Sequence, residues 1–118
     1  MKSNPRFGFI VTYVDDMEAA RRFYVEALGL AVEREAPSYV QFEHFAIAND
    51  ESMTGTREQE LYWLVDDAAA AYKEMASKAE VSMELKQMPF GNVFGIKDAD
   101  GHPRFVLELA RERPSQAV

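Results

Sequence analysis

The side chains of this sequence that could carry chemistry are carboxylates and two histidines, because the chain contains no cysteine. Disulfides, zinc–thiolate sites and cysteine nucleophiles are therefore excluded. Glu108 stands between two leucines in an apolar segment, and Glu60 opens another such segment. A carboxylate that lines a partly apolar cleft gains proton affinity, which suits a general base or an anchor for a cationic ligand. His44 and His102 fall in expected turns, where a lone histidine is more typical of the surface than of a ligand set.

Composition narrows the classes of function. Thirteen basic and 20 acidic residues give a net charge of -7. This balance argues against nucleic acid as a partner and is compatible with cationic ligands. The sequence has no Gly-x-Ser-x-Gly motif, no glycine-rich phosphate loop and no zinc pattern. No apolar run approaches the roughly 20 residues of a membrane span, and the N-terminus does not resemble a signal peptide. We expect a cytoplasmic protein with no membrane partner.

The first half of the chain predicts one strand, one helix and three further strands. Apolar residues at helical spacing predict a helix over 16–28, which Gly29 ends. Asp15 lies three residues before Glu18, the spacing of a capping box. β-branched and aromatic residues predict strands at 7–14, 30–36, 39–43 and 45–49.

The second half repeats this order. A shift of 51 positions lays residues 65–67 on residues 14–16, both reading Val-Asp-Asp. The predicted elements are a strand at 60–65, a helix from Asp66/Asp67, and strands at 81–88, 92–98 and 104–110. The predicted organisation is therefore a single domain over 1–118 made of two repeats, with a first unit at 7–50, a linker at 51–58, a second unit at 59–110 and a tail at 111–118.

The predicted class is α+β, built from two β-α-β-β-β units that form paired, strongly curved mixed sheets with a helix on the outer face of each. A lone unit would leave one face of its sheet bare, and two copies can share that face. A ferredoxin-like β-α-β-β-α-β domain is the main alternative. It has fewer strands than the sequence predicts, which favours the repeated unit.

Three segments carry a resemblance to a known family: residues 14–30, 64–75 and 96–109. In this order they resemble the vicinal oxygen chelate superfamily, which includes glyoxalase I, bleomycin-resistance and fosfomycin-resistance proteins and extradiol dioxygenases. Ala99 replaces the proline usual in the last segment, and Pro103 adds a residue to that turn. The resemblance implies the fold more strongly than any activity, because folds of this kind host many chemistries.

The resemblance also implies where a metal would bind. Metal-dependent members use the first and last strand of each unit, with histidine on the first strands and glutamate on the last. By spacing, these positions hold Phe9, Ala46 or Ala48, Glu60 and Glu108. Phenylalanine and alanine have no lone pair, and two carboxylates alone bind a hard cation weakly. We therefore expect no metal and no cofactor.

With Phe9 on the inward face, strand alternation predicts an aromatic cleft with two acidic points. The expected ligand-binding residues are Phe7, Phe9, Tyr13, Glu60, Tyr62, Val106 and Glu108. Tyr39 and Gln41, or instead Val40 and Phe42, join them. These aromatic residues are either the wall of a binding slot or simply core filling.

Two kinds of function remain open. The leading hypothesis is a binding protein similar to the bleomycin-resistance branch, which sequesters a flat aromatic or cationic compound without metal. The alternative is a metal-dependent lyase, transferase or dioxygenase, or a cofactor-free enzyme with Glu108 or Glu60 as general base. Members of the resembled family commonly complete their clefts by pairing, so a homodimer is the expected assembly.

Overall fold

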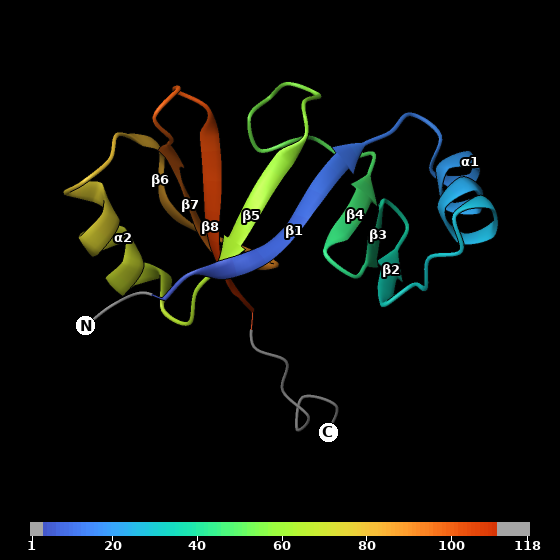
Figure 1. Cartoon of the computed structure of the whole chain (residues 1–118), viewed down its shortest axis with the longest axis horizontal. Coiled ribbons are helices and arrows are strands. Elements are labelled where there is room, and N and C mark those ends of the chain that lie inside the picture. Colours follow the sequence, from blue (N-terminus) through green and yellow to red (C-terminus); the bar gives the residue numbers. More distant parts are fainter. Residues whose placement is uncertain (1–3, 111–118) are drawn as a thin grey trace. The chain divides into compact units, whose positions relative to one another are not determined.

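The computed structural model describes residues 4–110, which form two compact units (Figure 1). The first unit comprises residues 7–62, and the second comprises residues 63–110 together with 4–6. Segment 51–58, expected to be a linker, groups with the first unit. The expected tail at 111–118 lies outside the described residues.

The first unit contains one helix and a small mixed sheet. Its elements are β1 (Arg6–Tyr13), α1 (Met17–Arg22), η1 (Phe23–Ala27), β2 (Arg34–Ala36), β3 (Tyr39–Phe42) and β4 (Phe45–Ala48). The strands lie in the order β2-β3-β4-β1, with β1 parallel to β4 and the other neighbours antiparallel. β5 (Glu60–Leu64) begins in this unit and ends in the second.

The core of the first unit lies between α1 and one face of its sheet. Val40, Phe42 and Ile47 are buried there, and Met17 and Tyr24 of the helical segment pack against them. The predicted helix at 16–28 is confirmed as a helical run over 17–27, whose last part is a π-helix.

The strand expected at 30–36 is shorter than predicted, since the strand spans only Arg34–Ala36, with one further backbone hydrogen bond from the amide of Glu33 to the Gln41 carbonyl. The amide of Leu30 donates a 2.9 Å hydrogen bond to the Tyr24 carbonyl at the helix end. Leu30 and Val32 then pack against the helix-side core. These two apolar residues therefore pack in the core beneath α1 and do not pair with a strand of the sheet.

The expected role of Asp15 in the helix cap is wrong. Asp16 is the N-cap residue, and its Oδ1 accepts a 3.0 Å hydrogen bond from the amide of Ala19. Asp15 instead forms a 2.8 Å ion pair with Arg57. A cap needs an extended backbone at the residue directly before the first helical turn, and Asp16 has that geometry.

The second unit repeats the plan. After the end of β5 it contains α2 (Ala68–Ala76), β6 (Val81–Met88), β7 (Gly91–Lys97) and β8 (Pro103–Leu109), with antiparallel strands in the order β8-β7-β6. Asp67 caps α2 by accepting from the amide of Ala70. Asp67 lies 51 positions after Asp16, so the sequence repeat corresponds to two equivalent helix caps.

The predicted turn before β8 is held by one aspartate. Asp98 Oδ1 accepts 2.9 Å hydrogen bonds from the amides of Asp100 and His102, and Oδ2 pairs with Arg104 at 3.2 Å. The His102 amide, followed by that of Asp100, holds the pKa of Asp98 below its usual range. Stabilising the charged form in this way fixes the turn between β7 and β8.

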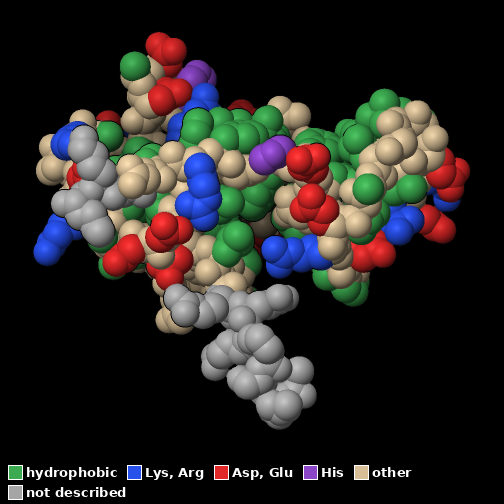
Figure 2. Space-filling view, turned by 60° about the horizontal axis from the view of Figure 1, so that its bottom comes forward, with side chains coloured by type: hydrophobic (Ala, Val, Ile, Leu, Met, Phe, Trp, Pro, Cys, Tyr) green, Lys and Arg blue, Asp and Glu red, His purple; other side chains and the backbone are tan. Residues whose placement is uncertain are grey.

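The surface carries acidic and basic side chains close together, with hydrophobic side chains between them (Figure 2). Phe23 and Leu28, at the end of the first helical segment, are 52% and 56% exposed. Within residues 4–110, neither helix has the length and apolar character needed to cross a membrane.

Candidate functional site

Glu60 is a buried carboxylate on the face of the first unit's sheet opposite α1. It opens β5 and is 2% exposed. The Tyr13 hydroxyl donates a 2.7 Å hydrogen bond to its Oε1, and the Tyr62 hydroxyl donates a second of 3.1 Å. The amide and hydroxyl of Thr54 donate to Oε2 at 3.1 and 3.4 Å. Four donors thus surround one carboxylate.

All four donors to Glu60 are neutral. Among residues 4–110, no lysine or arginine lies within ion-pair distance of this carboxylate. A carboxylate has about four lone-pair positions, so the hydrogen-bonding capacity of Glu60 is filled while its charge has no counter-ion in the described part of the chain. Glu60 thus differs from the exposed carboxylates that are paired with a basic side chain, such as Glu35 with Arg21.

The tyrosines around Glu60 are held in the neutral phenol form. Burial raises the pKa of Tyr13, and the hydrogen bond and negative charge of Glu60 raise it further. The pKa of Tyr62 rises for the same two reasons, with burial the larger. Burial also raises the pKa of Tyr39 to about 12. These phenols therefore act as hydrogen-bond donors at neutral pH.

Strand register places two alanines at the floor of this face. Ala48 pairs with Tyr39 of β3 and with Tyr13 of β1. Ala46 pairs with Gln41 on one side and lies opposite Val11 on the other. Of the two tyrosines that flank Ala48, Tyr13 bonds Glu60 through its hydroxyl, and Tyr39 bonds Gln41.

The structure decides which residues of β3 belong to this face. Val40 and Phe42 lie in the core beneath α1. Tyr39 and Gln41 therefore lie on the opposite face, where the Tyr39 hydroxyl donates to the side-chain carbonyl of Gln41. Gln41 in turn donates a 3.1 Å hydrogen bond to the Phe42 carbonyl, so its buried amide is well placed.

Phe9 and Phe7 differ in their relation to this site. Phe9 stacks on Tyr62, with ring centroids 5.1 Å apart and 14° between the planes. Phe7 is 38% exposed and faces the ring of His44 at 5.8 Å. Nδ1 of His44 lies 2.9 Å from the Gly8 carbonyl oxygen. This contact joins the turn between β3 and β4 to β1. Phe9 thus belongs with Glu60, while Phe7 lies toward the strand end.

The expected inward orientation of Val106 and Glu108 is wrong. Val106 is buried in the core beneath α2, together with Phe94 and Val65. Glu108 Oε1 accepts a 2.9 Å hydrogen bond from the amide of Ala68, the first residue of α2. Alternation correctly puts these two residues on one face of β8, and that face is the one α2 covers.

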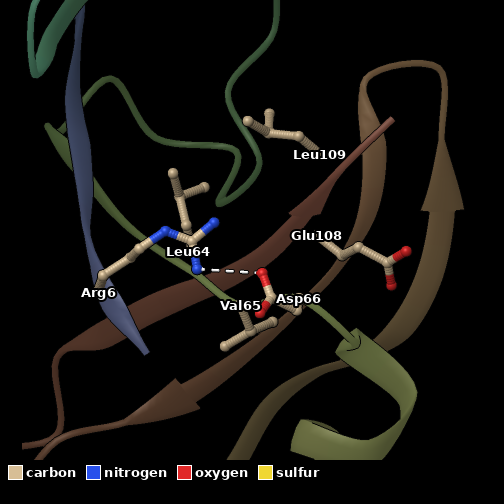
Figure 3. A pocket seen from close by; sticks show the side chains of 6 residues that line it. All are labelled: Arg6, Leu64, Val65, Asp66, Glu108 and Leu109. Carbon is tan, nitrogen blue, oxygen red and sulfur yellow. Dashed lines mark hydrogen bonds and ion pairs between the residues drawn. The ribbon is translucent and has the colours of Figure 1, made fainter. Parts of the chain in front are cut away.

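A cavity of about 150 Å³ lies beside Glu108 in the second unit (Figure 3). Its lining residues are Arg6, Leu64, Val65, Asp66, Glu108 and Leu109. The charged groups in it already have partners, since Arg6 pairs with Asp66 at 3.3 Å and Glu108 receives the helix amide. Glu60 does not line this cavity. We regard it as the better candidate because it is only 2% exposed, is surrounded by four neutral donors and lies beside the Phe9–Tyr62 stack.

The residues at the implied metal positions do not fit a divalent metal. Phe9 stacks on a ring, the two alanines form the sheet floor, and Glu108 caps a helix. Among these implied positions, Glu60 alone offers an oxygen to this face, and its lone pairs are taken. Among the described residues, no group of three histidine or acidic side chains is arranged to hold a metal ion.

Sequence reasoning missed Thr54 and Arg57, which lie in the segment read as a linker. Thr54 supplies two donors to Glu60. The Arg57 guanidinium lies 5.9 Å from the centroid of the Tyr13 ring. Hydrogen bonds among Ser52, Thr54, Thr56 and Glu58 fold the segment back on itself. No sequence periodicity marks such contacts, because they come from an irregular loop.

A family model matches residues 6–103, most of the chain, and describes the glyoxalase/bleomycin resistance protein/dioxygenase superfamily. The chain belongs to this superfamily. The resemblance seen in the sequence is thereby confirmed, as is the α+β fold. No curated protein matches the chain.

Solved structures agree with this membership at the level of fold. A glyoxalase/bleomycin resistance protein/dioxygenase superfamily member from Vibrio splendidus 12B01 has a TM-score of 0.67 at 17% identity, covering 89% of this chain and 99% of that one. Methylmalonyl-CoA epimerase from Mycobacterium tuberculosis has a TM-score of 0.69 at 18% identity, covering 99% and 96%. A Legionella pneumophila structure described as an NAD-dependent benzaldehyde dehydrogenase has a TM-score of 0.72 at 18% identity, covering 86% and 98%.

Proposed function

We propose that this superfamily member binds a flat aromatic or cationic small molecule against the Glu60 face of the first unit. The observation that carries the proposal is a buried carboxylate with no counter-ion among residues 4–110, surrounded by tyrosine hydroxyls and flanked by the Phe9–Tyr62 stack. A buried charge is costly unless it is balanced, and a cationic ligand would balance it. Aromatic rings would add stacking and cation–π attraction.

Ligand entry requires movement of segment 52–58, because Glu60 is covered. Thr54 bonds directly to the carboxylate, and Arg57 ties the same segment to Asp15. The Thr54 amide holds Oε2 at 3.1 Å, but the Thr54 hydroxyl bond is long at 3.4 Å and the Arg57–Asp15 pair is exposed, so few strong contacts hold the segment in place. The segment is thus suited to open and to close again over a bound molecule.

A thermal-shift screen tests the binding proposal. Flat aromatic cations and small organic phosphates of similar size are compared on the wild type, Glu60→Gln and Phe9→Ala. Aromatic cations should raise the melting temperature of the wild type, and both substitutions should blunt that rise. Glu58→Gln, which removes a nearby exposed charge, should respond like the wild type. Stabilisation by phosphates alone, or equal responses in all four proteins, would reject the proposal.

An acid–base enzyme without metal is a second candidate, favoured by the 2.7 Å contact between the Tyr13 hydroxyl and Glu60. A carboxylate and a phenol in direct contact can pass a proton between a substrate and the protein. The test incubates a panel of small ketones with protein in D₂O and follows C–H exchange by NMR. Exchange that exceeds buffer and disappears in Glu60→Gln would support an enzyme, and exchange at the buffer rate would reject it for that panel.

A further inference from the structure

Both oxygens of Glu60 already accept two hydrogen bonds each, and this restricts which cation the site can take. Oε1 receives the hydroxyls of Tyr13 and Tyr62, and Oε2 receives the amide and hydroxyl of Thr54. A ligand N–H group finds no free acceptor position on the carboxylate. A desolvated donor without a partner weakens binding, whereas a cation without N–H groups has nothing to satisfy.

The ring of Tyr13 already receives a cation on its face. The Arg57 guanidinium lies 5.9 Å from the ring centroid while its Nη2 bonds Asp15 at 2.8 Å. The distance is within the range of a cation–π contact. Charge attraction through an aromatic face is therefore available next to Glu60, without a hydrogen bond to the carboxylate.

We infer that the site selects quaternary or N-alkylated aromatic cations over primary ammonium compounds, with Arg57 occupying the position of the ligand's cation when the site is empty. This inference rests on the proposed binding function and names its ligand class. Quaternary ammonium groups are recognised by aromatic faces and long-range charge, which is what this face offers. Thr54 sets the preference through its two hydrogen bonds to Oε2, and Arg57 competes with either cation for the face of the Tyr13 ring.

A matched pair of probes tests the inference: benzyltrimethylammonium and benzylammonium carry the same ring and the same charge at pH 7. Affinities are measured by NMR titration on the full chain. We expect the quaternary compound to bind at least about tenfold more tightly. Neutral benzyl alcohol, the third probe, should bind more weakly than the quaternary compound.

Two substitutions separate the contributions. Thr54→Val keeps the backbone amide and the branched shape but removes the hydroxyl donor, so it frees one position on Oε2. Benzylammonium should then gain affinity and the preference should narrow by about threefold. Arg57→Gln removes the internal cation, so both charged probes should bind more tightly while their ratio stays the same.

The outcomes distinguish this inference from the binding proposal on which it rests. If both probes bind in a Glu60-dependent way but benzylammonium binds as tightly or more tightly, the selectivity is overturned and the binding proposal stands. An unchanged ratio in Thr54→Val likewise overturns the hydrogen-bond explanation. If neither probe binds, or if Glu60→Gln binds both normally, both proposals fail. If circular dichroism shows that Glu60→Gln does not fold, the affinity ratio of the two charged probes in Thr54→Val and Arg57→Gln tests the selectivity instead. A ratio that narrows in Thr54→Val and stays the same in Arg57→Gln supports it, and any other result overturns it.

Discussion

The Tyr13 hydroxyl donates a 2.7 Å hydrogen bond to Oε1 of Glu60, which lies 47 positions later in the chain. This contact joins β1 to the start of β5 inside the first unit and buries a carboxylate against neutral donors. It shows that Glu60 has a structural role in addition to its proposed role in binding. The consequences for stability can be tested without knowing the ligand.

Replacing Glu60 by glutamine should lower the free energy of unfolding by about 1–3 kcal/mol. Glutamine keeps one acceptor oxygen but turns an NH₂ group toward one pair of donors, so buried donors lose their partner. Urea denaturation of Glu60→Gln measures the loss. The exposed Glu58→Gln serves as control and should change stability by no more than about 0.5 kcal/mol. Equal stability of the two variants would show that Glu60 is not buried as described.

Stability should fall as the pH rises above about 10, the pKa of a tyrosine in the unfolded chain. Burial raises the pKa of Tyr39 to about 12, and burial with Glu60 also raises the pKa values of Tyr13 and Tyr62. The folded chain therefore keeps phenol protons that the unfolded chain has lost, so alkaline pH favours unfolding. Below pH 10 this stabilisation is fully present.

Denaturant unfolding between pH 8 and pH 11 measures this alkaline dependence. Tyr62→Phe removes one of the shifted groups and should make the fall with pH shallower. A free energy of unfolding that stays constant to pH 11 would contradict the burial of these phenols.

Glu108→Gln should lower the free energy of unfolding by about 0.5–2 kcal/mol, because the carboxylate accepts from the first amide of α2 and favours the positive helix end. The substitution should leave affinity for aromatic cations unchanged. Glu84→Gln, an exposed change on β6, is the matched control. A variant that keeps its stability but loses ligand affinity would place Glu108 in the binding site after all.

Protein purified without chelators should carry no stoichiometric zinc, nickel, manganese or iron. The reason is the donor set, since Phe9 and the alanines of β4 cannot ligate and Glu108 is engaged by α2. Elemental analysis makes the measurement. One bound metal per chain that is lost in Glu60→Gln would overturn our description of this face and favour a metal-dependent enzyme.

We also propose that the chain works as a homodimer. β2 and β6 are the edge strands of their sheets, and an unpaired edge exposes backbone groups that a second copy can cover. Light scattering at micromolar concentration should give about twice the chain mass of 13.4 kDa. A monomer mass at every concentration up to the millimolar range would contradict the proposal.

The sequence by itself determined the elements and the fold. Helical spacing in two segments, strand composition and the 51-residue repeat predicted both β-α-β-β-β units. The predicted first cap, Asp15, lies one residue before the actual cap Asp16, and Asp67 caps the second helix. These features are readable because they depend on neighbours a few residues apart, where local geometry is fixed. The aromatic residues Phe9, Tyr13 and Tyr62 were also found in this way, with Glu60 beside them.

Only the tertiary structure decided what the carboxylates do. In β8 the three consecutive residues Phe105, Val106 and Leu107 are all buried, so the strand is covered on both faces and alternation cannot say which face meets α2. Glu108 therefore accepts a hydrogen bond from the first amide of α2, although the sequence predicted that it lines the cleft. Thr54 bonds Glu60 from an irregular segment whose sequence has no periodicity. Contacts of this kind depend on how the loop and strands close in space, which no local pattern specifies.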